Sequence, residues 1–374
     1  MQLRTLGKTG FKPSALGFGC MRLPVKGEKK EVDEPQAIEM LRYAIDHGVN
    51  YLDTAYPYHN GQSETVIAKA LQDGFREKVV VADKMPIWEV KEYGDFDRLF
   101  NEQLERLQIE QIDYYLLHNL QGTSWPGMRD LGAIKWLEKT REAGKIKYLG
   151  FSFHDTVDIF KEIVDHYAWD MCQIQYNYAC EEVQAGTEGL KYAADKGLGV
   201  VIMEPLFGGT LANPPEPIRQ VWEEEDLDPV DAALRWLWNK PEVSLVLSGM
   251  STMDQVKANV ATAETAGVGG LSEKQTAAIK RAQAKYEELS PIPCSKCGYC
   301  LPCPEGVAIP ENFQLYNNAR MLGGNAQSLN HNLYVQKPDE MRAENCVGCR
   351  ECEEKCPQSI KISEWMPKIH EALK

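Results

Sequence analysis

The first 290 residues repeat one pattern eight times: a short apolar segment typical of a strand precedes an amphipathic segment with helical periodicity. The expected strands are residues 15–19, 51–53, 79–82, 114–117, 148–151, 171–175, 200–203 and 244–247. The expected helices are residues 35–47, 64–72, 97–107, 133–143, 157–166, 183–196, 230–238 and 253–264. Eight such units in about this length are typical of a closed, parallel (β/α)8 TIM barrel.

An open, doubly wound α/β sheet is the main alternative to this barrel. Such a sheet normally carries a GxGxxG fingerprint after its first strand. Here the first strand continues into LGFGCMRLP, which does not match that fingerprint. The sequence therefore favours the barrel.

The cysteines indicate a second domain. Eight of the 11 cysteines lie between Cys294 and Cys356. Without a secretory signal, this density favours metal or cluster binding over disulfides. We therefore expect a barrel domain over residues 1–290 and a cysteine-rich domain over residues 291–374.

Composition excludes two classes of function. The chain has 41 Lys and Arg against 55 Asp and Glu, a formal net charge of −14, and no basic run, so we expect no nucleic-acid partner. No apolar run approaches the roughly 18 residues of a membrane-spanning helix, so we expect no membrane partner. The first residues lack the apolar core of a signal peptide, and we expect a cytoplasmic protein.

Polar side chains follow three consecutive strands of the predicted barrel. Asp53 ends the second strand and Tyr58 follows it, Lys84 ends the third, and His118 ends the fourth. Catalytic residues of such barrels lie at the carboxyl ends of the strands. Each of these residues alone is a weak signal, but together they form a coherent acid–base site.

This set suits the reduction of a carbonyl group. Tyr58 would deliver a proton to the carbonyl oxygen while a hydride reaches the carbon. A phenol has an ordinary pKa of about 10, and a neighbouring ammonium such as that of Lys84 lowers it. Asp53 would keep Lys84 charged, and His118 would orient the carbonyl oxygen.

At these residues the sequence resembles the aldo-keto reductase superfamily over roughly residues 1–290. The matching motifs, in chain order, are LGKTGFKPSALGFGCMRLP, DTAYPY, VVVADK, YYLLHNL, GFSFHD, QIQYN, VIMEPLFGGTL and LVLSGMSTMDQVKANV. The resemblance implies a catalytic tetrad and an NADP(H) or NAD(H) cofactor. It implies cofactor contacts from Ser152, Gln175, Met203, Ser248, Gly249, Gln255 and Asn259.

Three positions depart from the common family pattern. Phe153 stands where many members have a carboxamide-binding Asn, with His154 next to it. Met203 replaces a Tyr that often stacks on the nicotinamide, and a thioether also packs on an aromatic ring. Gly249 and Gln255 replace basic residues that often hold the 2′-phosphate of NADPH. The family default is NADPH, and this sequence leaves NADH open.

The cysteine-rich part holds two runs, CSKCGYCLPCP and CVGCRECEEKCP. The second has the bacterial ferredoxin spacing C-x2-C-x2-C-x3-C-P, in which the fourth cysteine binds the other cluster. The spacing therefore predicts two [4Fe–4S] clusters. Cys294, Cys297, Cys300 and Cys356 would bind one, and Cys346, Cys349, Cys352 and Cys303 the other. The first run has two residues, not three, before Cys303.

Zinc is the alternative metal, because zinc sites with four cysteine ligands also use C-x2-C pairs. Two runs that each end in Cys-Pro favour the ferredoxin pattern instead. Segments 310–322 and 329–337, between the runs, have a helical pattern, so we expect a mainly helical two-cluster ferredoxin-like domain.

Three functions fit both halves. The first is an NAD(P)-dependent oxidoreductase that interconverts a small carbonyl compound and an alcohol by direct hydride transfer, with Tyr58 as general acid and base. The second is an electron-transfer oxidoreductase whose clusters link a substrate to a redox partner protein. The third is a redox-sensing binding protein built on the same barrel.

Overall fold

The computed structural model describes residues 1–27, 31–292, 294, 298, 300–322, 324–356 and 359–374. The chain divides into two compact units. One comprises residues 1–205 and 231–272, and the other comprises residues 206–230 and 273–374. The predicted domain boundary between residues 290 and 291 stays a prediction, since a compact unit need not coincide with a domain.

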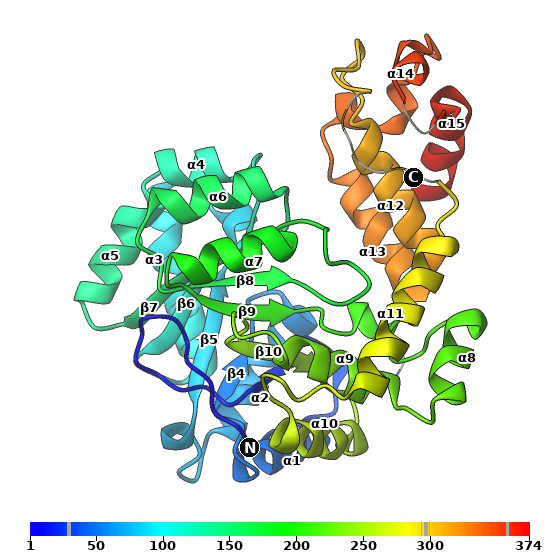
Figure 1. Cartoon of the computed structure of the whole chain (residues 1–374). Helices are drawn as coiled ribbons and strands as arrows, with labels where there is room; N and C mark the ends of the chain where they lie inside the picture. The colour runs from blue at the N-terminus through cyan, green and yellow to red at the C-terminus, as the bar shows by residue number, and fades with distance from the viewer. Residues whose placement is uncertain (28–30, 293, 295–297, 299, 323, 357–358) are drawn as a thin grey trace. The chain divides into compact units, whose positions relative to one another are not determined.

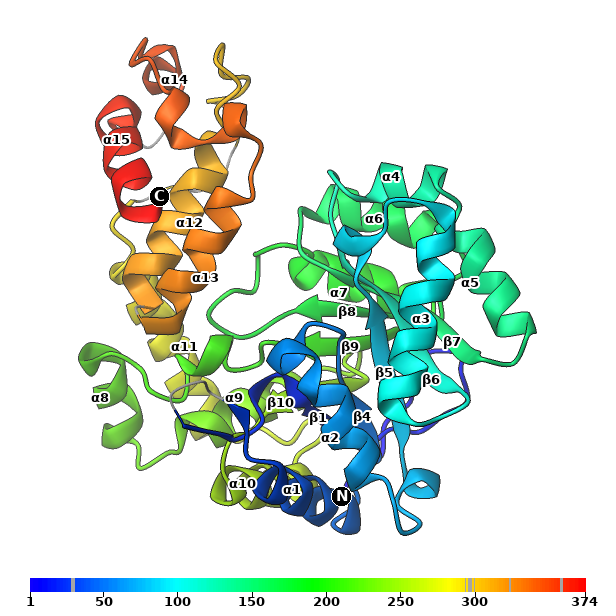
Figure 2. The same cartoon turned by 180° about the vertical axis from the view of Figure 1, so that it is seen from behind.

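The first unit is a closed barrel of eight parallel strands, as predicted (Figures 1 and 2). The strands follow the order β1-β10-β9-β8-β7-β6-β5-β4 around the barrel. Their bounds are β1 (Leu16–Gly19), β4 (Tyr51–Asp53), β5 (Val80–Met85), β6 (Ile112–Leu120), β7 (Ile146–Phe153), β8 (Met171–Gln175), β9 (Gly199–Met203) and β10 (Leu245–Gly249). A separate two-stranded ribbon pairs β2 (Val25–Lys26) with β3 (Glu31–Val32).

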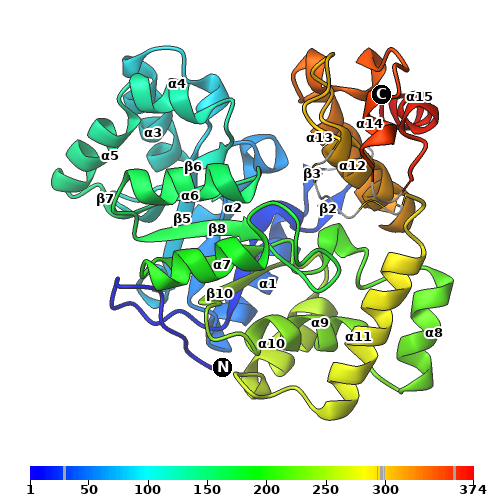
Figure 3. The same ribbon diagram turned by 45° about the horizontal axis from the view of Figure 1, so that its top comes forward.

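Helices surround this barrel and bury their apolar faces against it (Figure 3). They are α1 (Glu34–Asp46), α2 (Gln62–Ala70), α3 (Tyr93–Leu107), α4 (Trp125–Asp130), α5 (Ala133–Glu142), α6 (Val157–His166), α7 (Gly186–Asp195), α9 (Pro229–Trp238) and α10 (Met253–Thr265). The strands are covered on both faces, which is why they read as continuous apolar runs.

The barrel is closed at the amino ends of its strands. Leu6, from the N-terminal segment, is fully buried there in a cluster with Tyr51 and Tyr114. The approach is so close that a Cβ at Gly199, the first residue of β9, would lie 2.5 Å from Leu6 Cδ1. The opposite end, at the carboxyl ends of the strands, is therefore where a site can form.

The strand register brings the carboxyl ends to a common edge. Gly19 of β1 pairs with both Asp53 and Gly249, and Gln175 of β8 pairs with Met203 of β9. Residues that are far apart in the sequence thus become neighbours at one rim.

The second unit is mainly helical in its described residues, as predicted. Its helices are α8 (Glu216–Glu224), α11 (Glu273–Glu288), α12 (Ile309–Leu322), α13 (Gly324–Val335), α14 (Glu351–Glu354) and α15 (Ile362–Leu373). Helix α8 packs with α11, and α12 packs with α13 and α15. An apolar core that includes Ile292, Phe313, Tyr334 and Met366 holds this unit together.

Candidate active site

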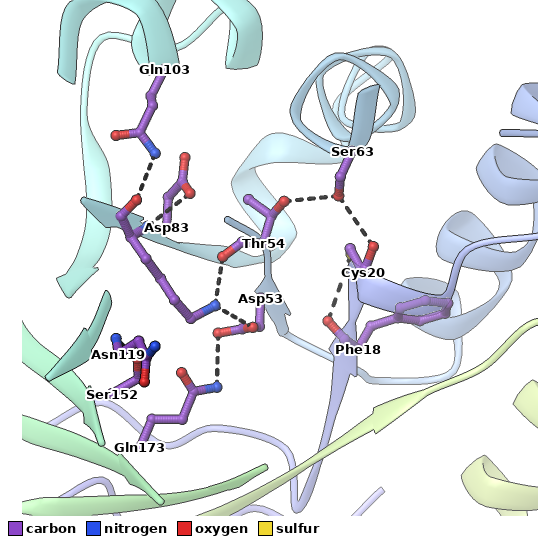
Figure 4. A network of polar contacts seen from close by, with 11 residues as sticks. Phe18, Cys20, Asp53, Thr54, Ser63, Asp83, Gln103, Asn119, Ser152 and Gln173 are labelled. Atoms are coloured by element: carbon purple, nitrogen blue, oxygen red, sulfur yellow. Dashed lines mark hydrogen bonds and ion pairs between the residues drawn. The ribbon is translucent and has the colours of Figure 1, made fainter. Parts of the chain in front are cut away.

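Lys84 and Asp53 form a buried ion pair at the ends of β5 and β4 (Figure 4). Lys84 Nζ lies 2.6 Å from Asp53 Oδ1 and donates a second 2.6 Å hydrogen bond to the Thr54 carbonyl. The two charged side chains are only 1% and 4% exposed. Burial lowers the pKa of Lys84, but Asp53, Tyr58 and Asp83 together outweigh burial, and the pKa is raised. Lys84 is therefore held as a cation.

Burial raises the pKa of Asp53, and Lys84 offsets part of that rise. Because a proton on Asp53 would leave the Lys84 ammonium uncompensated, we regard the pair as ionised.

Tyr58 faces this ammonium from the turn after β4. Lys84 Nζ lies 5.1 Å from the centroid of the Tyr58 ring. Burial raises the pKa of the Tyr58 hydroxyl, and Lys84 lowers it by less, so the net pKa is above its usual value. Lys84 lowers the pKa of Tyr58, as the sequence predicts, but burial raises that pKa by more.

His118 completes the group from β6. Its ring centroid lies 6.1 Å from that of Tyr58, with the rings nearly perpendicular at 83°, and 5.1 Å from that of Trp88. The strand is irregular here: its register with β7 shifts between Leu117 and Leu120. Such irregularities re-aim side chains next to active sites.

His118 is neutral at ordinary pH. Burial, the Lys84 charge and the nearby His154 hold the pKa of His118 well below its ordinary value. Its Nδ1 is buried without a hydrogen-bond partner among the described residues. A neutral ring with a free nitrogen can orient a substrate oxygen without competing for the Tyr58 proton.

The structure thus brings together all four residues predicted from the strand ends. It also adds Gln173, which the sequence analysis missed. Gln173 Nε2 donates a 3.3 Å hydrogen bond to Asp53 Oδ2, and its Oε1 has no partner among the described residues (Figure 4). The alternation of strand side chains puts residues 173 and 175 on the same face, which is the signal that could have identified it.

A second layer fixes the backbone of Lys84. Gln103 Nε2 donates to the Lys84 carbonyl at 3.0 Å, and the Lys84 N–H donates to Asp83 Oδ1 at 2.8 Å. Asp83 and Glu64 are both fully buried. Burial and then the Glu64 charge hold the pKa of Asp83 well above its usual range. Arg106 Nη1 donates a 2.9 Å hydrogen bond to Glu64 Oε2.

The predicted cofactor residues lie along the rim from β7 to β10. Ser152 Oγ accepts the Asn119 N–H at 2.7 Å and so supports the backbone next to His118. Gln175 Oε1 accepts a 3.1 Å hydrogen bond from Gln184, in the loop after β8. Met203 is half-buried at the end of β9.

The remaining predicted cofactor residues lie around the start of α10. Asn259 Nδ2 donates to Ser248 Oγ at 3.0 Å, and Gln255 Oε1 accepts the Ser251 N–H at 2.8 Å. The N-terminus of a helix at a strand end suits a phosphate group. This helix N-terminus is therefore where the predicted cofactor would place a phosphate.

Arg22 is a basic residue at this rim that the sequence analysis did not single out. It follows β1 and lies against Gly249, where a Cβ would be 2.8 Å from Arg22 Cγ. A side chain at position 249 would displace Arg22. Arg22 therefore occupies the space next to Gly249, one of the predicted cofactor residues.

The predicted cluster ligands lie in the second unit, except that Cys297 is outside the described residues. Cys294, Cys300, Cys303, Cys346, Cys352 and Cys356 are half-buried and pack against the apolar core, while Cys349 is exposed. Burial and then Cys346 and Cys349 raise the pKa of Cys352 to about 11. A cluster in this unit would bind these cysteines as thiolates.

Within the described residues no three His, Cys, Asp or Glu side chains converge as they would around a single metal ion. No described helix has the length and apolar character needed to cross a membrane.

Comparisons with known proteins agree with this geometry. A family model described as "Aldo/keto reductase family" matches residues 15–284, and one described as "4Fe-4S dicluster domain" matches residues 293–360. The second match favours iron–sulfur over zinc for the cysteine-rich part.

Individual relatives support the same family. L-galactose dehydrogenase of Arabidopsis thaliana is 30% identical over 291 residues, covering 70% of this chain and 88% of the plant protein. The aldo-keto reductase AKR11C1 from Bacillus halodurans, in its holo form, is 26% identical with a TM-score of 0.64, over 75% of this chain and 96% of that one. An aldo-keto reductase from Klebsiella pneumoniae in complex with NADPH shares the fold at 24% identity, with a TM-score of 0.61 over 75% of this chain and 95% of that one.

Proposed function

We propose a function for this chain from the premise that it belongs to the aldo/keto reductase family and carries a 4Fe-4S dicluster domain. The proposed reaction is the reversible conversion of a small carbonyl compound to an alcohol with NAD(P)H. The observation that supports it most directly is the Lys84–Asp53 pair, at 2.6 Å, facing the Tyr58 ring.

In the reduction, Tyr58 would donate its proton to the carbonyl oxygen. The ammonium of Lys84 would stabilise the phenolate that remains, and Asp53 would keep that ammonium charged. His118, held neutral, would donate a hydrogen bond to the same oxygen and orient it. A nicotinamide bound along the rim from Ser152 to Asn259 would supply the hydride. In the oxidation the proton returns to Tyr58 and the hydride would return to the nicotinamide.

Two [4Fe–4S] clusters are proposed in the second unit, held by the eight cysteines as the ferredoxin spacing predicts. In this proposal they stabilise the unit and do not take part in hydride transfer, because a nicotinamide moves two electrons and a cluster moves one. We expect the assembled protein to be brown and sensitive to oxygen.

One observation favours a second function, electron transfer through the clusters to a partner protein. Cys349 is exposed, and its neighbour Val347 is 68% exposed. A cluster bound by this run would lie close to the surface, where a redox partner could exchange single electrons with it.

An anaerobic stopped-flow experiment separates the two functions. Cluster-replete protein is mixed with NADH or NADPH and a panel of carbonyl compounds, while the nicotinamide and cluster absorbance bands are recorded together. Oxidation of the nicotinamide with unchanged cluster absorbance supports direct hydride transfer. Bleaching of the clusters within the turnover time supports electron transfer.

The Tyr58→Phe variant tests the assigned acid. Loss of a positioned general acid lowers kcat by about 10²–10⁴-fold. Tyr51→Phe is the matched control, because Tyr51 is fully buried on β4 and its hydroxyl has no hydrogen-bond partner among the described residues. Equal activity of Tyr58→Phe and the control would refute the role of Tyr58.

A further inference from the structure

The carboxyl end of β6 carries one residue more than the strand beside it. Two pairs of residues enclose the extra one: Leu117 with Phe151, and Leu120 with Phe153. Strand β6 thus takes three steps where β7 takes two, and His118 and Asn119 lie opposite Ser152 alone. Two residues opposite one is the arrangement of a β-bulge.

Asn119 has the backbone conformation that this bulge requires. Its φ is 59°, in the left-handed region that Asn adopts more readily than most residues. A bulge leaves its extra residue unpaired in the ladder. Here the Asn119 N–H donates to Ser152 Oγ at 2.7 Å instead, and Asn119 Oδ1 accepts a 3.2 Å hydrogen bond from Gln121 Nε2 (Figure 4). The bulge is therefore held both by β7 and by the loop after β6.

The extra residue reverses which side chains of β6 face the barrel interior. Leu116 belongs to the interior cluster, and the alternation of a strand places His118 on the same side. In a regular strand Leu120 would also face inward. It instead pairs with Phe153, whose ring packs outward, 5.1 Å from the ring of Phe160 on α6. Because paired residues share a face of the sheet, Leu120 is buried on the outer side.

The bulge therefore makes His118 the last side chain of β6 that faces the interior. The His118 ring lies 6.1 Å from the ring of Tyr58 and 5.1 Å from that of Trp88. Its Nδ1 is buried and has no hydrogen-bond partner among the described residues, so no hydrogen bond at that atom fixes the ring. The position of the ring thus depends on the backbone that carries it.

We propose that Asn119 is a positioning residue for the reaction: its left-handed backbone holds the His118 ring against Tyr58. This inference rests on the proposed function, because it assumes that His118 orients the reacting oxygen. Asn119 does not touch the substrate in this proposal and acts only through His118. The competing role is purely structural, in which the left-handed residue affects folding and not the reaction.

The chain offers a matched control for that competing role. Gln108 also has a left-handed backbone, with a φ of 53°, and it is exposed. It follows the last residue of α3 and precedes the amino end of β6, the opposite end of the strand from Asn119. A β-branched residue at either position meets the same steric penalty, but only position 119 adjoins the site.

The test uses full-length, cluster-replete protein under anaerobic conditions, with a panel of short aldehydes and ketones. The readouts are the single-turnover rate of nicotinamide oxidation, the Kd of NAD(P)H and Tm. Asn119→Val should lower the rate by about 5–30-fold, the cost of forcing such a residue into the left-handed region, and leave Kd within about twofold. Asn119→Gly, which adopts that region freely, should keep the rate within about threefold of the wild type.

Two further variants separate the roles. Gln108→Val should lower Tm as much as Asn119→Val and leave the rate within about twofold. In the His118→Ala background, Asn119→Val should change the residual rate by less than about twofold, because no ring remains to be positioned. If Asn119→Val does not fold, Asn119→Ala replaces it, and its loss of rate should fall between those of Asn119→Gly and the expected valine value.

Equal effects of Asn119→Val and Gln108→Val on the rate would overturn the proposal. So would a loss in Asn119→Gly as large as that in Asn119→Val, or an undiminished effect of Asn119→Val in the His118→Ala background. Each of these results leaves the proposed function standing. No turnover of any carbonyl compound or alcohol by the wild type would overturn the proposed function itself, and the role of Asn119 with it.

Discussion

The buried ion pair between Lys84 and Asp53 gives the sharpest prediction for stability. Asp53→Asn removes the carboxylate and leaves the Lys84 ammonium buried next to neutral acceptors, among them the Thr54 carbonyl and the Tyr58 hydroxyl. Both side chains are at most 4% exposed, so water cannot compensate the charge. Removing one partner of such a pair costs about 3–5 kcal/mol of stability.

That cost is large enough to measure by calorimetry. For a unit of this size, 1 kcal/mol shifts Tm by about 2–4 °C, so Asp53→Asn should lower Tm by roughly 10 °C. Hydrogen exchange of peptides from β5 and β6 identifies the transition that belongs to the barrel. Lys84→Met should cost a similar amount, because it leaves the Asp53 carboxylate buried.

The double variant Asp53→Asn/Lys84→Met separates charge from packing. With neither charge present, it should lose less stability than the two single variants together, by a coupling energy of about 1–3 kcal/mol. The surface pair Lys69–Glu34 is the matched control, since its distance is also 2.6 Å but its side chains are 48% and 43% exposed. Glu34→Gln should change stability by less than about 1 kcal/mol.

Simple additivity of the two single variants would refute the reasoning, because it would mean that the charges do not depend on each other. So would an effect of Asp53→Asn no larger than that of Glu34→Gln.

Two other predictions concern pH and the clusters. Burial raises the pKa of Glu204 from 4.5 to about 7, so the wild type should lose stability as pH rises through this window. Glu204→Gln has no proton to lose, so above pH 7 it should be more stable than the wild type by about 3 kcal/mol at most. Below a pH of about 4.5 the two proteins should have the same stability. Equal curves of Tm against pH for the variant and the wild type would contradict this prediction. Removing iron with a chelator should expose the amides of α12 and α15 to hydrogen exchange while β5 and β6 stay protected, since the half-buried cysteines pack on the core of the second unit. Simultaneous loss of protection in both units would contradict that prediction.

The juxtaposition of Asp53, Tyr58, Lys84 and His118 was predictable because these residues lie at or just after the ends of consecutive strands. Hydrophobic runs locate those ends, and closure of the barrel places them at one rim. The cysteine spacing predicted the dicluster domain for a similar reason, since two-residue gaps are a local property of the chain.

The contacts around that group were not predictable in the same way. Residues 173 and 175 share a face of β8, and periodicity alone does not say which one reaches Asp53. The register decides it: Gln173 pairs with Ser152 of β7, while Gln175 lies further along, opposite Met203 of β9. The buried Asp83–Glu64 pair joins β5 to α2, and no local pattern predicts that two carboxyls meet there.

The sequence by itself determined the barrel, the dicluster domain and the residue types of the acid–base group, because these follow from local periodicity and spacing. The tertiary structure decided how those residues behave. Burial outweighs the Lys84 charge in setting the pKa of Tyr58, and burial with Lys84 lowers the pKa of His118 and keeps it neutral. Desolvation depends on what every neighbouring element places around a group, so only the assembled fold determines it.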